Sequence, residues 1–189
     1  CGNNAGDGYV LAKLAVEDGK NVRVFNCFNP EKLDGEAKTA YQDLLTANVR
    51  IEKEFSVRDG QDDSMFEKGF WNKTAPVVVD AIFGTGLTRD ICEENLVDVI
   101  RQINEYSQKT LSIDIPSGLN ADTGHVMNIA VSADVTTTFM SNKRGMLTHD
   151  GCEYSGRIVL DNLNIPCDCY TEFFKECDRK HATIKLGAH

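Results

Sequence analysis

The stretch PVVVDAIFG (residues 76–84) decides the fold class of this 189-residue chain. Its apolar, β-branched run is typical of a strand in a parallel sheet with both faces covered. Similar short runs recur along the chain at 21–27, 50–55, 110–116, 133–140 and 156–165. Helical patterns lie between them, near 7–18, 35–48 and 92–106. This alternation predicts a doubly wound α/β domain, with a mostly parallel sheet in a Rossmann-like, three-layer α/β/α arrangement.

The charge of the chain excludes several kinds of partner. Its 20 Lys and Arg against 29 Asp and Glu give a net charge of −9, and no basic cluster occurs. Nucleic acid and anionic membranes are therefore not expected as partners, because clustered positive charge binds both. A small anionic ligand stays compatible, because N–H groups at a helix start can hold phosphate. The chain also has no apolar run long enough to predict a membrane span.

The seven cysteines indicate the redox environment. Their number is odd and they are scattered along the chain, which is typical of reduced thiols rather than of a disulfide framework. We therefore expect a cytoplasmic protein. An organelle stays open, because a sequence that starts at Cys1 does not show a natural N-terminus.

The stretch GNNAGDG (residues 2–8) directly precedes a helical pattern. Ligands of parallel sheets bind in the turns that lead from strands into helices, so we expect a strand just before Cys1. Gly6 and Gly8 would let a ligand approach the backbone closely. The same stretch would also suit a tight turn in which Asn and Asp cap the helix. It matches neither of the usual glycine-rich nucleotide-binding motifs.

Two further loops follow predicted strands, DAIFGTGLTRD (80–90) and SIDIPSGLNADTG (112–124). Asp80 closes an apolar strand, and Asp114 stands between two isoleucines at the end of another. A buried acid is costly unless it is paired, protonated or bound to a cation. Each acid alone could instead be a helix cap or a structural residue. Because all three loops belong to one edge of the predicted sheet, we expect them to form a single site.

Four motifs in order carry a resemblance to a known family: GNNAGDGYV, VVDAIFGTGLTR, IDIPSGLNADTG and TTTFMSNKRGML. Together they resemble the YjeF N-terminal domain family, the NAD(P)H-hydrate epimerases. The resemblance runs from residue 2 to about 165. It departs at Ala5, where the family usually has Gly, and in lacking the preceding strand and the N-terminal helices that help to pair two subunits in the family.

The resemblance implies a reaction and a set of site residues. Family members interconvert the 6R and 6S epimers of hydrated NADH and NADPH, and they bind a potassium ion; a homodimer is also implied. Carried over to this chain, the ion ligands are Asn4, Asp80 and Ser117. Their hard oxygen donors suit such a cation better than zinc. The implied substrate-binding residues are Asn3, Asn4, Ala5, Gly6, Asp7, Gly84, Thr85, Gly86, Leu87, Thr88, Arg89, Asp90 and Asp114.

Asp114 is the expected catalytic residue. A carboxyl group in reach of carbon 6 could protonate the departing hydroxyl and deprotonate the incoming water. Lys143 could reach the site from a further strand end and balance the charge of a diphosphate, or it could be a solvated surface lysine.

Several alternatives complete the sequence-based picture. We expect residues 1–165 to form the epimerase domain, without its first strand and N-terminal helices, and 166–189 to form a C-terminal helix or linker. The last residues of that segment, RKHATIKLGAH (179–189), resemble the start of a dehydratase domain. A non-catalytic scaffold or nucleotide-binding dimerisation module is the alternative function, and a dinucleotide oxidoreductase is disfavoured by the missing glycine fingerprint. Four possible zinc ligands near the C-terminus lack the common spacing: Cys167, Cys169, Cys177 and His181.

Overall fold

The fold is an α/β arrangement of parallel strands and helices, which confirms the predicted fold class. The structure is a computed structural model that describes residues 3–47, 49–52 and 77–165. In it, β1 (Arg23–Phe25) pairs with β2 (Arg50–Glu52) in a parallel sheet of two strands. A second, four-stranded parallel sheet has the order β3 (Val78–Asp80), β4 (Thr110–Ile113), β5 (Val135–Phe139) and β6 (Arg157–Asp161). Each strand lies inside a predicted range but is shorter than that range.

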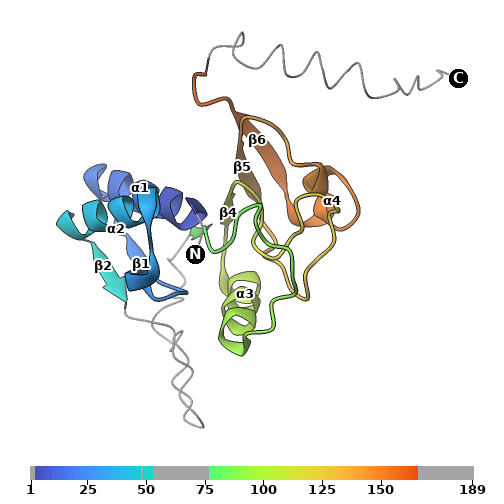
Figure 1. The fold of residues 1–189 in the computed structure, drawn as a ribbon, viewed down its shortest axis with the longest axis horizontal. Coiled ribbons are helices and arrows are strands. Elements are labelled where there is room, and N and C mark those ends of the chain that lie inside the picture. The colour runs from blue at the N-terminus through green and yellow to red at the C-terminus, as the bar shows by residue number, and fades with distance from the viewer. Residues whose placement is uncertain (1–2, 48, 53–76, 166–189) are drawn as a thin grey trace, which may run out of the picture.

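Two helices cover the two-stranded sheet. α1 (Asn3–Glu17) and α2 (Gly35–Thr46) lie beside each other next to β1 and β2, as Figure 1 shows. Tyr9 and Leu44, one from each helix, are buried in their common core. A short 3₁₀ helix, η1 (Pro30–Lys32), precedes α2.

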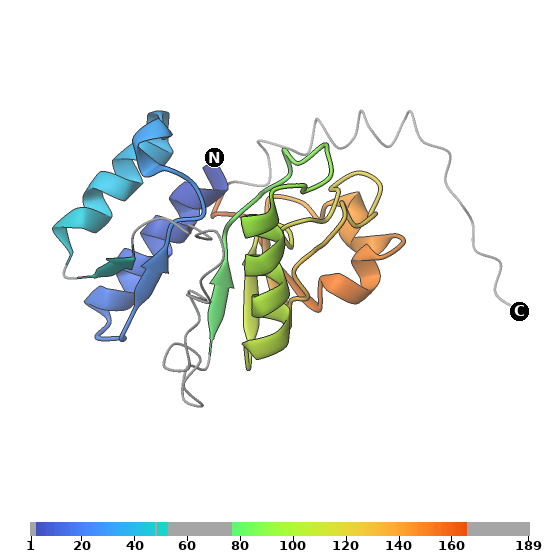
Figure 2. The ribbon, with the colours of Figure 1, turned by 90° about the horizontal axis from the view of Figure 1, so that it is seen from below.

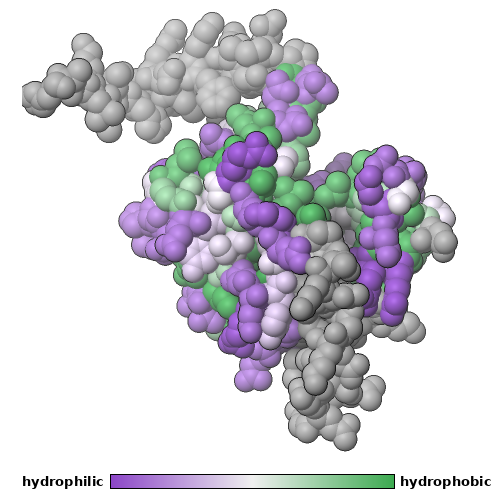
Figure 3. Space-filling model, turned by 180° about the vertical axis from the view of Figure 1, so that it is seen from behind, coloured by the Kyte–Doolittle hydropathy of each residue, from purple (hydrophilic) through white to green (hydrophobic). Residues whose placement is uncertain are grey.

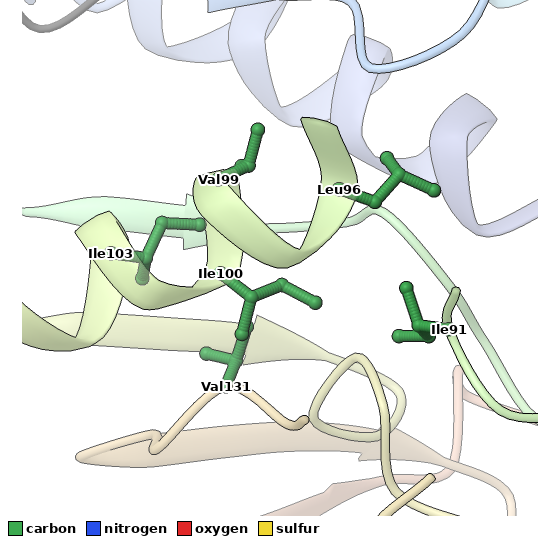
Figure 4. Close-up of a cluster of buried hydrophobic side chains, with 6 residues drawn as sticks. All are labelled: Ile91, Leu96, Val99, Ile100, Ile103 and Val131. Carbon is green, nitrogen blue, oxygen red and sulfur yellow. The ribbon is translucent and has the colours of Figure 1, made fainter. Parts of the chain in front are cut away.

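α3 (Glu94–Tyr106) packs on the four-stranded sheet through one apolar face. Its buried side chains meet Ile91 from the loop before the helix and Val131 from the segment before β5, as Figure 4 shows. Ile100 and Val131 are completely buried there. Two further short helices, η2 (Arg144–Leu147) and α4 (Gly151–Tyr154), lie between β5 and β6.

β3 differs from the prediction in how it is covered. Val78 packs against the core under α3, but Val79 on the other face is 41% exposed. The expectation that both faces of this strand are covered is therefore wrong, because the face that carries Val79 is partly open. Viewed from behind, the surface of the described residues mixes apolar and hydrophilic residues (Figure 3).

α1 begins earlier than predicted. Residues 3–8, expected to form a turn, are already helical, because the same Asn, Asp and Gly residues that favour turns also suit the first turn of a helix. Gly6 and Gly8 serve close packing here: a Cβ on Gly8 would lie 2.7 Å from Cβ of Ala81. Figure 2 shows β3 on the side of its sheet that faces α1 and β1. A strand before Cys1 stays a prediction.

Candidate active site

A cavity of about 640 Å³ lies at the carboxyl end of the four-stranded sheet. Its wall comes from the first turns of α1, from the loop between β3 and α3, and from the residue that follows β4. Open parallel sheets bind their ligands at this end. The cavity brings together most of the residues predicted to bind substrate: Asn3, Asn4, Asp7, Gly84, Thr85, Gly86, Leu87, Thr88, Arg89, Asp90 and Asp114.

Ala5 and Gly6, from the same predicted set, do not line this wall. Ala5 packs against the core between α1 and α2. Gly6 faces α2, where an added Cβ would lie 3.0 Å from Cα of Ala37. These two residues set how closely the helices approach, and so they position the start of α1 beside the cavity.

Asp80, the last residue of β3, does not line the cavity and is only 1% exposed. Its carboxylate accepts hydrogen bonds from the hydroxyls of Ser112 and Ser117, and from the backbone N–H groups of Ser117 and Ile82. Burial raises the pKa of Asp80, although these four hydrogen bonds oppose the shift. A cation bound beside this buried carboxyl group would compensate the negative charge of its ionised form.

Phe83 connects Asn4 and Ser117 through its backbone. Its carbonyl oxygen accepts from Nδ2 of Asn4 at 2.9 Å, and its N–H donates to Oγ of Ser117 at 2.8 Å. The three predicted ion ligands, Asn4, Asp80 and Ser117, are thereby joined in one hydrogen-bonded network.

Asn4 carries an unusual free acceptor. The residue is 7% exposed, yet its buried Oδ1 has no hydrogen-bond partner within the described part of the chain. An unsatisfied buried acceptor costs about 1–3 kcal/mol, so it calls for an explanation such as an ion. The oxygen donors of Asn4, Asp80 and Ser117 fit an alkali or alkaline-earth cation in type and in charge.

Asp114 follows β4 directly and has a left-handed backbone conformation, with φ of 68°. Its N–H donates to the carbonyl of Thr137 on β5 at 2.7 Å, which fixes the turn. Its carboxylate forms an ion pair with Lys143 in which both side chains are largely shielded, with 18% and 16% exposed. Lys143 also donates to the hydroxyl of Thr138 at 2.9 Å. Lys143 is therefore a partner of the site acid and not a solvated surface lysine.

Asp7 is the second carboxyl group next to Asp114. It stands on α1, is exposed, and lines the cavity. Partial burial, followed by the negative charges of Asp114 and Glu36, raises the pKa of Asp7. The site therefore combines one ion-paired carboxylate with one carboxyl that is held toward its protonated form.

Sequence reasoning missed part of the wall, which also includes Ile82, Phe83, Ile91, Glu93 and Phe139. The apolar residues among them look like ordinary strand or core residues, so no signal in the sequence distinguishes them as part of a cavity wall. Glu93 was identifiable in principle, because it lies four residues after Arg89 near the start of α3 and pairs with it at 2.9 Å.

The described residues contain no group of three or more His, Cys, Asp or Glu side chains that could bind a metal ion. The candidate zinc ligands at 167–181 lie outside the described residues, and so does the predicted C-terminal helix or linker. No helix in the described part of the chain is long and apolar enough to cross a membrane.

Relatives of known name match most of the chain. It is 38% identical over 164 residues to an NAD(P)H-hydrate epimerase of Levilactobacillus brevis, which covers 87% of this chain and 69% of that protein. It is 37% identical over 168 residues to a bifunctional NAD(P)H-hydrate repair enzyme of Thermofilum pendens. That match covers 87% of this chain but only 30% of the relative, so the chain spans less than a third of the bifunctional protein.

A solved structure and a family model agree with these matches. The crystal structure of the yeast protein YNL200c superposes with a TM-score of 0.70 and 20% identity, over 91% of this chain and 67% of the yeast chain. This likeness shows the fold. The family model described as YjeF-related protein N-terminus matches residues 1–145. The chain therefore belongs to the family of YjeF-related protein N-termini, as its four motifs indicated.

Proposed function

We propose that this protein is an isomerase that interconverts the 6R and 6S forms of hydrated NADH and NADPH. The observation that carries the proposal is the carboxylate of Asp114, which Lys143 holds at the wall of a cavity large enough for part of a dinucleotide. Support also comes from the relatives that bear the name NAD(P)H-hydrate epimerase. Their names give no support to the alternative of a non-catalytic scaffold.

The chemistry needs one reactive position on the substrate. Carbon 6 of the hydrate carries a hydroxyl next to the ring nitrogen. Protonation of this hydroxyl by a carboxyl group lets it leave as water, while the nitrogen lone pair forms a double bond to carbon 6. Water then adds again and loses a proton to a carboxylate. Asp114 is the proposed group in hydrogen-bond reach of this oxygen.

The loop from Gly84 to Asp90 is the proposed holder of the phosphates. A Cβ on Gly86 would meet nothing within 4 Å, and Arg89, which pairs with Glu93 at 2.9 Å, brings its guanidinium to the cavity wall. At the far end the loop is fixed, because the side chain of Asn128 donates to the carbonyl of Ile91 at 2.8 Å. A loop that is anchored at its ends loses little conformational freedom when it binds an anion.

A potassium ion is the proposed cofactor, held by Asn4, Asp80 and Ser117. The free Oδ1 of Asn4 and the buried carboxyl oxygens of Asp80 support this assignment. When bound, the ion would supply positive charge beside the carboxylates of the site. A homodimer, which the family resemblance implies, and a cytoplasmic location, which the odd number of scattered cysteines predicts, are further parts of the proposal.

The proposal is tested by following the epimer ratio of purified 6R NADH hydrate by chromatography, in potassium and in cation-free buffer. We expect a potassium-dependent approach to equilibrium that is much faster than the spontaneous rate. Asp114→Asn should slow it by about 100-fold or more, whereas the exposed Asp122→Asn, outside the cavity, serves as the matched control. If folded wild-type protein interconverts the epimers no faster than the spontaneous reaction does, the proposal is refuted.

A further inference from the structure

Epimerisation makes a demand that a single carboxyl group does not meet. The hydroxyl leaves carbon 6 from one face of the ring, and the water that forms the other epimer enters from the opposite face. A proton donor or acceptor must lie within hydrogen-bond reach of the oxygen that it serves. One group beside one face therefore cannot serve both oxygens while the ring stays in place, and a second acid–base group is needed.

The cavity contains a second carboxyl group in a suitable place. Asp7 comes from α1 and Asp114 from the end of β4, so the two acids enter the same cavity from different elements. Among the charged groups around Asp7, Asp114 raises the pKa of Asp7 the most. The buried, unpartnered Oδ1 of Asn4, one turn before Asp7 on α1, marks the same region as a site for a ligand.

The other acids of the wall fit this role less well. Glu93 is engaged by Arg89 in an ion pair of 2.9 Å. Asp90 is exposed and comes from the same loop as Glu93, between β3 and α3. Asp7, unlike Glu93, has no hydrogen bond or ion pair to hold its carboxyl among the described residues, so it is free to exchange a proton with a substrate.

The surroundings of the two acids separate their roles. Lys143 compensates the negative charge of Asp114, whereas Asp7 is partly buried and faces two negative charges that favour its protonated form. Two carboxyl groups whose environments differ in this way act as acid and base.

We propose that Asp7 and Asp114 are a pair of catalytic acid–base groups, one for each face of the ring; this inference rests on the proposed function. Protonated Asp7 donates its proton to the hydroxyl on its face, the C6–O bond breaks, and water leaves. The lone pair of the ring nitrogen forms the N=C6 double bond. Water on the other face adds to C6, the double-bond electrons return to nitrogen, and Asp114 accepts the proton. The proton has then moved from Asp7 to Asp114, and proton exchange of the two carboxyl groups with solvent water restores the starting state before the next turnover.

Exchange of the C6 oxygen with labelled water tests the acid–base group on each face of the ring separately. Each purified epimer of NADH hydrate is incubated with the protein in ¹⁸O-labelled water, and label and epimer ratio are followed by chromatography with mass spectrometry. Wild-type protein should put label into both epimers. In Asp7→Asn, Asp114 can still release and restore water on its own face, so one epimer should exchange its oxygen while conversion to the other falls by about 100-fold or more.

Asp114→Asn should give the reciprocal result, with exchange confined to the other epimer. Asp122→Asn is the matched control: it removes an exposed carboxyl group outside the cavity, and it should keep both exchange and conversion. Asp7→Ser, at the same exposed position, repeats the test if the Asn variant is poorly folded.

Three outcomes would overturn the inference. Unchanged conversion in Asp7→Asn would exclude a role for Asp7. A parallel loss of exchange and conversion in both epimers would indicate a single acid–base group. If wild-type protein neither exchanges nor converts either epimer, the proposed function fails, and this inference fails with it.

Discussion

Replacing Asn4 by Ala tests the proposed ion site through stability rather than activity. Without a cation the change has two opposing parts. Loss of the hydrogen bond from Nδ2 of Asn4 to Phe83 costs about 0.5–1.5 kcal/mol, and removal of the unpartnered Oδ1 returns about 1–3 kcal/mol. The carbonyl of Phe83 keeps a second, longer contact with the hydroxyl of Ser117 at 3.3 Å. The free energy of unfolding of the variant in cation-free buffer should therefore lie between about 0.5 kcal/mol below and about 2.5 kcal/mol above that of wild type.

Potassium should stabilise wild-type protein more than Asn4→Ala. At about 100 times its dissociation constant, an ion that binds only the folded state adds about 2.7 kcal/mol to the free energy of unfolding. Asn4→Ala removes one of the three proposed side-chain ligands, so most of this gain should disappear. The assay is urea unfolding followed by far-ultraviolet circular dichroism, in potassium chloride and in choline chloride at equal ionic strength.

Asn3→Ala is the matched control for this experiment, because Asn3 is the exposed neighbour of Asn4 on the same helix. It should keep the full potassium-dependent gain. An equal gain in Asn4→Ala and in wild type would refute the assignment of Asn4, and no gain in either protein would refute the ion site itself.

Three further predictions concern the frame of the site. Ile100→Ala, at a completely buried position, should lower the free energy of unfolding by about 2–5 kcal/mol in urea titrations, without a change in the potassium dependence. Gly118→Ala should prevent stable folding, seen as a lost unfolding transition, because φ is 96° and a Cβ would lie 1.9 Å from the carbonyl oxygen of Ile129. Hydrogen bonds from Lys109 and Thr110 lower the pKa of Asp134, so Asp134 stabilises the fold above its unfolded pKa and this contribution is lost as the pH falls through the lowered pKa. Asp134→Asn should therefore lower the urea midpoint at pH 7 but have little effect near pH 2, and an equal effect at both pH values would contradict this account.

The sequence predicted the strand and helix positions because apolar periodicity reports which residues are buried. It also predicted that the acids at the ends of β3 and β4 share one edge of the sheet, which follows from parallel topology. It failed at the start of α1, because Asn, Asp and Gly signal a turn and a helix N-terminus equally well. Local composition could not decide between the two.

Other features of the site were beyond sequence reasoning for a different reason. The link between Asn4 and Ser117 runs through the backbone of Phe83, and backbone groups are the same in every residue. The pairing of Lys143 with Asp114 depends on the path of the chain after β5. Only the three-dimensional structure shows that Lys143 turns back toward the end of β4.

Asn4 stands at the boundary between the cavity wall and the buried network that contains Asp80. An ion held by this network and a nucleotide in the cavity would share that one side chain, so binding of one would change the affinity for the other. Thermodynamic linkage then requires the effect to be mutual and equal in size. The salt composition around the protein would thus set how much nucleotide it binds, even if the ion takes no part in proton transfer.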